Sequence, residues 1–475
     1  MGAIANRIAV ENNTAKYIAT DNTDVIQKFE ALLSFIRKHA GLRENGELLS
    51  VLEKENLVEM PDFYDNLFFK SALDIIKCVQ GNHDNLAKHF AEVHRHIQPY
   101  AIYFPQFYPI PENNVNFYEG YTDMTNLVAA KLEDPSLLTP LKNLLGFYDL
   151  VQNVEVIPRQ IKIAKSFGMA GFAIYYYWFS DNSISHKHMI FQEVIDRFFD
   201  TVLENFSLFF VYCNEAWTKN VAFGTHRGGY TIANNYTEEN VKANMQNLVT
   251  YFRHPNYRKI RNRPVLFLHH PHEMTGTEIR LLKTVGDSIT QENGFDGIEL
   301  VMDSKEGMYP YFSGYYLHAN YKSAKAKEFM NTSTRPKHID YKAYVREFLP
   351  KEKKLGDNAS TINSVFTNFD NTVRFYAHEG DRQFEDVGNK AMFMTRTQGR
   401  SVTLFKEFLD VQLKKYSQKS DPISQIFLIN AWNEWGEQMV MEPSNEEGFA
   451  YLEAFQERLL LTPLPDSALS NAWNQ

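Results

Sequence analysis

The stretch GFAIYYYW, residues 171–178, is an uninterrupted run of small, aliphatic and aromatic residues without a charge. Such a run is typical of a β-strand that is buried on both faces, as in a parallel sheet. Seven further short runs rich in apolar, aromatic and β-branched residues follow the same pattern. They are YAIYF (100–104), SLFFVYC (207–213), PVLFLHH (264–270), IELVM (298–302), YFSGYYLH (311–318), INSVFTNF (362–369) and IFLINAW (426–432).

Amphipathic segments separate most of these runs. Examples are VEVIPRQIKIAKSFG (154–168), ENVKANMQNLVTYF (239–252), EIRLLKTVGDSI (278–289) and LFKEFLDVQLKKY (404–416). Short buried strands that alternate with helices indicate parallel βα units. Eight units over roughly 360 residues predict an α/β fold, a (β/α)8 TIM barrel with elaborated loops. The connection DSKEGMYP (303–310) is short for a helix, so the unit between the fifth and sixth runs fits least well.

Residues 1–97 have a different pattern of apolar and polar residues from residues 98–475. The segment NTDVIQKFEALLSFIRKHAG (22–41) places Ile26, Phe29, Leu33 and Ile36 on one helical face, and Gly41 marks a stop. We therefore expect a helical N-terminal domain or extension over residues 1–97 and a catalytic barrel over residues 98–475. No motif in the first part carries an assignable chemistry.

Composition narrows the class of protein. Apolar residues make up 44% and charged residues 23% of the chain, which is ordinary for a globular protein. The formal net charge is −9 and no basic stripe occurs, so nucleic acid is not expected as a partner. The two cysteines, Cys78 and Cys213, lie far apart, which favours a reducing compartment. With no convincing signal peptide and no apolar stretch of about 18 residues, we expect a cytoplasmic protein that does not span a membrane.

Polar and aromatic residues recur where the predicted strands end, which is where a TIM barrel builds its active site. Carboxylates and amides bind hydroxyl groups, while aromatic faces stack on the C–H faces of sugar rings. The pattern therefore predicts a carbohydrate site. The expected substrate-binding residues are Gln106, Tyr177, Trp178, Asn214, Glu215, Trp217, His270, Asp370, Asn371, Asn433 and Trp435, and Asp303, His318 and Asn320 also follow strand runs.

The eighth run leads into NAWNEWGEQMVMEP (430–443), which contains two carboxylates three residues apart, Glu434 and Glu437. On a helical turn their Cβ atoms would lie roughly 5–6 Å apart. Retaining glycosidases hold their two carboxyls about 5–5.5 Å apart, so this pair is the candidate catalytic pair. One carboxyl kept protonated by apolar neighbours such as Trp435 would act as the acid, and its ionised partner as base or nucleophile. The structural alternative is an ordinary helix N-terminus, where acidic residues favour the helix dipole.

These motifs resemble a known family. From about residue 101 to residue 442 the chain resembles the WbsX-type glycosyltransferases of bacterial surface-polysaccharide clusters, which are similar to the endo-α-mannosidases of glycoside hydrolase family 99. The matching motifs are AIYFPQFYPIPENN (101–114), YEGYTDMTN (118–126), LGFYDL (145–150), GFAIYYYWF (171–179), NEAWT (214–218), FDNTVR (369–374), NAWNEWGE (430–437) and EP (442–443).

The resemblance implies a (β/α)8 barrel that acts on glycosidic bonds. In the endo-mannosidases the first glutamate of the pair is proposed to deprotonate the 2-hydroxyl of the sugar, which then attacks to give a 1,2-anhydro sugar. The second glutamate protonates the leaving group. Carried over by motif, Glu434 is similar to the base and Glu437 to the acid/base, and this chemistry needs neither a metal nor another cofactor.

Several positions depart from the family pattern. Tyr176 replaces a usual histidine, Ala216 replaces the second asparagine of N-E-N-W-T, and Phe369 replaces the tryptophan of W-D-N-T. Gln438 stands where the family has glycine after the second glutamate, and the motif after Gly120 is loosened at residues 122–124. The carboxylate pair is intact, so catalysis is still expected, and these departures bear on both the substrate and the activity.

Other constellations have simpler explanations. His269 and His270 are adjacent in a strand and point to opposite faces, so they and His272 do not all reach one metal ion. Asp370 and Asn371 also fit an Asx-type turn, and Asn214 with Glu215 also fit structural hydrogen bonds. No Walker motif and no G-x-G-x-x-G occurs, which weakens the case for a nucleotide-sugar donor.

The sequence thus predicts a carbohydrate-active enzyme whose substrate is an oligosaccharide or polysaccharide, with a nucleotide sugar as a further candidate. A glycosyltransferase of bacterial surface-polysaccharide biosynthesis is the first expectation. A retaining endo-glycosidase that uses a neighbouring 2-hydroxyl is the first alternative. A non-catalytic glycan-binding protein is the second.

Overall fold

The computed structural model describes residues 89–117, 119–134, 136–140, 147–218, 230–303, 314–316, 330–331, 337–348, 361–376, 395–416, 421–444 and 446–462. Most of the expected helical region 1–97 lies outside these ranges, as do His318, Asn320 and most of the connection 303–310. The division into two domains therefore stays a prediction.

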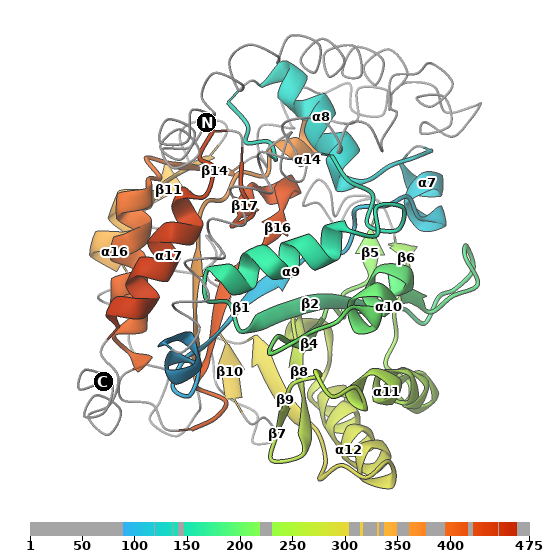
Figure 1. The fold of residues 1–475 in the computed structure, drawn as a ribbon. Coiled ribbons are helices and arrows are strands. Elements are labelled where there is room, and N and C mark those ends of the chain that lie inside the picture. The colour runs from blue at the N-terminus through green and yellow to red at the C-terminus, as the bar shows by residue number, and fades with distance from the viewer. Residues whose placement is uncertain are drawn as a thin grey trace.

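Eight parallel strands form the centre of the molecule (Figure 1). Each overlaps one of the eight runs singled out in the sequence, so the strand prediction is confirmed. The strands are β1 (Gln98–Tyr103), β2 (Gly171–Trp178), β4 (Ser207–Tyr212), β8 (Arg263–Leu268), β9 (Glu299–Asp303), β10 (Gly314–Tyr316), β13 (Thr361–Phe366) and β15 (Ile426–Asn430).

The strands pair in the order of the chain. Each forms parallel pairs with its neighbours, from β2 through β4, β8, β9, β10 and β13 to β15. Strand β1 pairs with β15 through Tyr100↔Leu428 and with β2 through Tyr100↔Gly171. The protein therefore has an α/β fold with a mainly parallel central sheet.

The four predicted amphipathic segments form α9 (Val156–Ser166), α11 (Glu238–Phe252), α12 (Gly276–Glu292) and α16 (Val402–Leu413). Three of them begin at a hydroxyl residue whose oxygen accepts a backbone N–H of the first turn, namely Thr237, Thr275 and Ser401. The remaining longer helices are α8 (Asp123–Glu133), α10 (Gln192–Asp200) and α17 (Ala450–Leu461). In Figure 1, α11 packs on α12 and α16 on α17 along the outside of the strands.

Shorter elements complete the described chain. The helical ones are α7 (Pro111–Asn116), α13 (Tyr341–Ala343), α14 (Val373–Tyr376), a π-turn (Tyr344–Phe348) and two 3-10 turns (Pro271–Glu273 and Trp435–Glu437). The extended ones are β3 (Met189–Ile190), β5 (Trp217–Thr218), β6 (Tyr230–Ile232), β7 (Lys259–Ile260), β11 (Met330–Asn331), β12 (Lys337–Asp340), β14 (Thr395–Gln398), β16 (Asn433–Glu434) and β17 (Met439–Val440). Among the residues that the structure covers, no helix is both long enough and apolar enough to cross a membrane.

Strand β2 shows which side chains of the sheet face the surrounding helices and which face the opposite side. A Cβ at Gly171 would lie 1.8 Å from the carbonyl oxygen of Ser207, so only glycine allows this close pairing with β4. Successive side chains of a strand point to opposite faces. The hydroxyl of Tyr176 donates to Asn244 (2.7 Å) and the indole N–H of Trp178 to Asn240 (2.9 Å), both on α11. Tyr175 and Tyr177 therefore lie on the other face, away from that helix.

Candidate active site

The two candidate catalytic carboxyls lie on a short hairpin behind β15. Strand β16 (Asn433–Glu434) pairs antiparallel with β17 (Met439–Val440), and the 3-10 turn Trp435–Glu437 forms the tip. The turn is three residues long and is followed by a strand. The explanation of these acidic residues as an ordinary α-helix N-terminus therefore does not apply.

Arg374, on α14, joins the two carboxyls. Its Nη1 lies 3.1 Å from Oε1 of Glu437, and its Nη2 lies 3.5 Å from Oε2 of Glu434. One guanidinium thus faces both carboxyls, which places their oxygens around a common point. Sequence reasoning quoted Arg374 as the end of the FDNTVR motif but did not assign it a role.

Burial distinguishes the two glutamates. The side chain of Glu434 is 6% exposed, whereas that of Glu437 is 22% exposed. Burial raises the pKa of Glu434 well above its ordinary range, and the negative charges of Glu437 and Asp123 raise it further, while Arg374 opposes them. Of the two carboxyls, Glu434 is therefore the one whose protonated form burial favours.

Asp123, at the start of α8, supports the tip of the hairpin from the opposite side. Its Oδ2 accepts the backbone N–H of Gly436 at 2.9 Å. A Cβ at position 436 would lie 2.6 Å from that oxygen, so glycine is required for the contact. Burial raises the pKa of Asp123, against the effects of Arg374 and the Gly436 N–H. Asp123 is thus a third acidic neighbour of Arg374. In the sequence it stood out only as part of the departure from the family motif at residues 122–124.

Trp435 is fully buried, and its ring has no exposed surface in this conformation. Its indole N–H donates to Oε2 of Glu442 at 2.8 Å. Glu442 also accepts from Gln160 (2.7 Å) and from the hydroxyl of Tyr148 (3.0 Å). Desolvation raises the pKa of Glu442 to about 7, although these hydrogen bonds lower it. Trp435 therefore anchors the turn that carries the candidate carboxyl pair to a buried polar network that was not expected from the sequence.

Two of the expected binding residues use their amides to hold backbone in place. Asn433 accepts the N–H of Phe104 (2.8 Å) and donates to its carbonyl (3.0 Å), which ties the hairpin to the end of β1. Asn214 does the same for His270, with 2.8 Å in each direction. Both asparagines are fully buried, so they position the neighbouring strand ends.

Aromatic residues lie on the inner side of the β2 end. The rings of Tyr177 and Trp217 have centroids 5.5 Å apart in an edge-on arrangement. Burial is the main cause that raises the pKa of Tyr175, and Glu434 is the largest of the charges that add to it. Tyr175 therefore lies close to Glu434, although it was not among the residues expected from the sequence. Trp178 lies on the α11 face of β2 and is not brought to this cluster.

Two histidine–carboxylate pairs lie at the neighbouring strand ends. Nε2 of His270 is 3.7 Å from Oε2 of Glu215, and Nδ1 of His269 is 3.7 Å from Oδ2 of Asp303. All four side chains are partly exposed. In the described part of the chain, no group of three or more metal-binding side chains has the arrangement of a metal site.

The remaining expected residues lie in the loops around the hairpin. Asp370 accepts the backbone N–H of Thr372 at 3.0 Å, which is an Asx-type turn, and Asn371 accepts the N–H of Thr395 at 2.8 Å. Gln106 is buried, and its carbonyl accepts the N–H of Asp123 at 3.4 Å. The structure thus groups Gln106, Asp370, Asn371, Asn433 and Trp435 around the carboxyl pair, and Tyr177, Trp217, Asn214, Glu215 and His270 at the adjacent strand ends.

Comparisons with known proteins agree with the motifs. The family described as Glycosyltransferase WbsX matches residues 99–455. The chain is 26% identical over 389 residues to the uncharacterized protein WxcX of two strains of Xanthomonas campestris pv. campestris. This match covers 78% of the chain and 50% of the relative, so the chain spans about half the length of the curated relatives it matches.

Among solved structures, the chain is similar to the GH99 endo-alpha-mannosidase from Bacteroides thetaiotaomicron in complex with Bis-Tris-propane. The identity is 15%, the TM-score is 0.45, and 77% of this chain and 96% of that chain are covered. It is also similar to a glycoside hydrolase-like protein, with 11% identity, a TM-score of 0.46, and coverage of 77% and 94%.

Proposed function

The chain belongs to the glycosyltransferase WbsX family, and from that premise we propose that it transfers glycosyl residues at Glu434 and Glu437 during bacterial surface-polysaccharide biosynthesis. One observation carries the proposal. A single guanidinium, that of Arg374, contacts both carboxyls of the pair, and the pair lies directly behind the carboxyl end of a parallel strand. Two carboxyls joined by one cation in a partly exposed site supply the acid and the base that chemistry at a glycosidic bond needs.

The proposed scaffold is a closed (β/α)8 barrel. Its support is the parallel pairing of β1 with both β15 and β2, together with the unbroken series of neighbouring pairs between those two strands. In such a barrel the carboxyl ends of all eight strands surround one site. The Glu434–Glu437 hairpin, Trp217 and His270 would then face the same bound glycan.

The two carboxyls share one proton in the proposed mechanism. Before a sugar binds, the proton is proposed to rest on Glu434, because that side chain is the more deeply buried and burial raises its pKa. A bound sugar would cover the partly exposed Glu437 and present a hydroxyl to Glu434. The proton would then move to Glu437, which leaves Glu434 as the base for a sugar hydroxyl and Glu437 as the acid for the leaving oxygen. Arg374 limits the charge that the pair develops during this exchange.

Partly exposed side chains are the proposed glycan contacts. Trp217, Glu215 and His270 offer a ring face, a carboxylate and an imidazole at adjacent strand ends. The buried residues Asn214, Asn433 and Trp435 would act indirectly, since their polar atoms already hold neighbouring groups. An oligosaccharide or polysaccharide is the proposed substrate, and an activated sugar, such as a nucleotide sugar, is the proposed donor.

Hydrolysis or transglycosylation is the second candidate function, because the carboxyl pair alone is sufficient for retaining chemistry by a neighbouring hydroxyl. Calorimetry against nucleotide sugars and manno-oligosaccharides, with the wild type and Glu437→Gln, distinguishes the candidates. Transfer predicts that a nucleotide sugar binds and that its sugar is passed to an acceptor. Hydrolysis predicts binding of the free oligosaccharide alone, followed by its cleavage in the wild type. A glycan-binding protein would bind oligosaccharide equally in both forms and turn over neither panel.

A further inference from the structure

Gln438, the residue after Glu437, has a backbone conformation that side-chain-bearing residues rarely adopt. Its φ is +56° and its ψ is 20°, in the left-handed region that favours glycine. Its side chain is nevertheless fully used, because the residue is 1% exposed and both amide atoms are bonded. Oε1 accepts the N–H of Leu138, and Nε2 donates to the carbonyl oxygens of Trp435 (2.9 Å) and Leu138 (3.3 Å). The amide thus joins the catalytic turn to the segment that follows α8.

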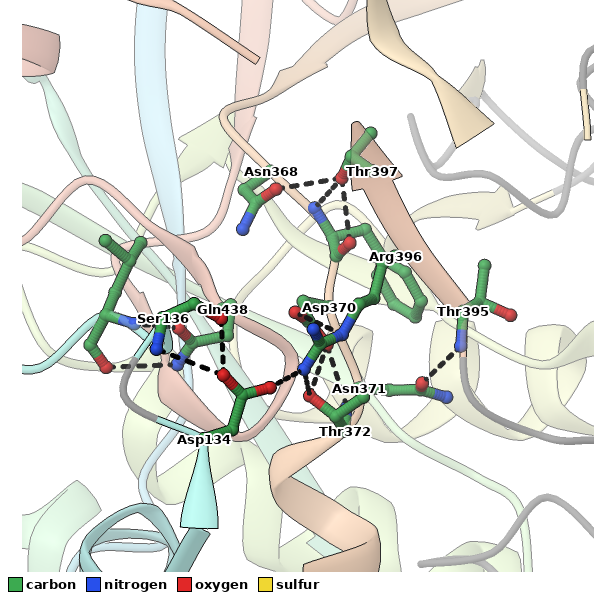
Figure 2. Close-up of polar contacts among 12 residues, drawn as sticks. Asp134, Ser136, Asn368, Asp370, Asn371, Thr372, Thr395, Arg396, Thr397 and Gln438 are labelled. Atoms are coloured by element: carbon green, nitrogen blue, oxygen red, sulfur yellow. Dashed lines mark hydrogen bonds and ion pairs between the residues drawn. The ribbon is translucent and has the colours of Figure 1, made fainter. Parts of the chain in front are cut away.

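The same segment is held a second time through Asp134. Figure 2 shows that Asp134 lies against the guanidinium of Arg396, on β14, with which it forms an ion pair. Arg396 reaches the loop after β13 as well, since its Nε lies 3.1 Å from Oδ2 of Asp370. Its Nη2 also donates to Oγ1 of Thr372 at 2.9 Å. Arg396 therefore ties the segment after α8 to the loop that leads to Arg374.

Asp370 completes the connection to the catalytic turn. Its backbone N–H donates to the carbonyl oxygen of Glu437 at 2.8 Å. The contacts now form a closed circuit that leaves Glu437 through Gln438, passes through Leu138, Asp134, Arg396 and Asp370, and returns to Glu437. Glu434, by contrast, is held by its strand pairing with Met439. The circuit therefore acts on the more exposed of the two carboxyls, whose position burial alone does not fix.

We infer that Gln438 and Arg396 are positioning residues, which act through this circuit to hold Glu437 against Arg374. Side-chain networks of hydrogen bonds and ion pairs hold the groups that they join, and a catalytic group needs supporting contacts that keep it within about 0.5 Å of its working position. The inference rests on the proposed function in one respect, namely that Glu437, the residue held by these contacts, is a catalytic group. The circuit itself is independent of the reaction.

The test uses Gln438→Gly, Arg396→Met and the double variant in the full chain. Glycine suits the left-handed conformation, so Gln438→Gly removes the amide without adding strain. Where turnover is measurable, each single variant is expected to lower kcat by about 10- to 100-fold with little change in KM, since a displacement of about 1 Å costs this much. The double variant should be no slower than the slower single variant, because either change opens the same circuit. Arg346→Met, which removes an exposed ion pair with Glu407, is the matched control and should leave kcat unchanged.

A second readout needs no turnover. The titration of Glu434 is followed by NMR of carboxyl-labelled glutamate, assigned with Glu434→Gln. Glu434 faces Glu437 on its own turn, Arg374 on α14, Asp123 on α8 and the hydroxyl of Tyr175 on β2. Release of Glu437 removes a negative charge that raises the pKa of Glu434, so both single variants should lower its midpoint.

Unchanged Glu434 titration in both variants, or kcat losses that multiply in the double variant, would overturn the positioning role. If the wild type turns over none of the tested glycans, the proposed function fails while the titration still decides the inference. If Arg396→Met does not fold, Arg396→Lys replaces it, because lysine keeps the charge but loses the fork that reaches both Asp134 and Asp370.

Discussion

Nη1 of Arg374 lies 3.1 Å from Oε1 of Glu437, although the two residues belong to loops that follow different strands of the sheet. The same guanidinium reaches Glu434, so the positive charge is shared by both members of the pair. A single cation beside two carboxyls favours a state in which one of them is ionised and the other is protonated. This arrangement is what acid–base chemistry at one glycosidic bond requires.

Removal of Arg374 should therefore disturb the protonation of the pair. Arg374 lowers the pKa of Glu434 against the effect of burial, so Arg374→Met should raise that pKa further. In the pH–rate profile, the part of the kcat curve that reports ionisation of Glu434 should move to higher pH. The value of kcat itself should fall by about 100-fold, as for the loss of a charge-stabilising group. Arg374→Lys should keep part of the pH behaviour, since it retains the charge but not the fork. A pH–rate profile that is the same in all three proteins would exclude this role.

The roles of the two glutamates can be separated with leaving groups. Glu437→Gln removes the proposed acid, so it should retain much of its rate on a substrate with a good leaving group, such as an aryl glycoside, and lose it on a natural glycan. Glu434→Gln removes the proposed base and should be slow on both. The reverse pattern would make Glu434 the acid, which is the carboxyl whose pKa burial raises.

Glu442 should make folding stability depend on pH. Its pKa is raised from 4.5 to about 7, so the folded state binds more protons than the unfolded state in that interval. Stability from this group is therefore fully present at lower pH and is lost as the pH rises from about 4.5 to about 7. Glu442→Gln should remove this pH dependence. Between about pH 4.5 and about pH 7, the unfolding free energy of the variant should therefore rise by about 3 kcal/mol relative to that of the wild type. Urea unfolding at several pH values measures it, and parallel curves for the two proteins would contradict it.

Trp217 and Trp178 form a matched pair for glycan binding. Trp217 packs edge-on against Tyr177 on the inner side of the strand ends, whereas Trp178 bonds Asn240 on the α11 side. Trp217→Ala should weaken glycan binding by about 10-fold, the upper range for one aromatic contact. Trp178→Phe should lower stability slightly and leave the affinity unchanged. Calorimetry on both variants measures the two affinities. Equal losses of affinity would contradict the assignment of glycan binding to the Trp217 face of β2 alone.

The strands could be predicted from the sequence because strands buried on both faces are continuous apolar runs, as in 171–178 and 426–432. The same pattern could not say which side chains of a run face the site. Tyr177 and Trp178 are equally aromatic, and only the contacts with α11 decide their directions. The run 311–318 likewise predicted a strand, and its described part, Gly314–Tyr316, is one. The rest of that run lies outside the described residues.

The carboxyl pair could be predicted because both members lie in one short motif at a strand end. Arg374 and Asp123 could not be assigned to the pair, since packing of α8 and α14 against the 3-10 turn brings them there. Trp435 illustrates the opposite problem. An aromatic residue beside a catalytic carboxylate was expected to contact the sugar, but its indole N–H instead bonds the buried Glu442.

Glu434 and Glu437 are proposed to carry out chemistry on a glycosidic bond. Product analysis by mass spectrometry, after incubation with nucleotide sugars plus acceptor and with manno-oligosaccharides, tests it most directly. The wild type and an exposed control, Glu273→Gln, should form product at the same rate, and Glu434→Gln and Glu437→Gln should each be slower by at least about 100-fold. Product formation at the wild-type rate by either of these two variants would contradict the account.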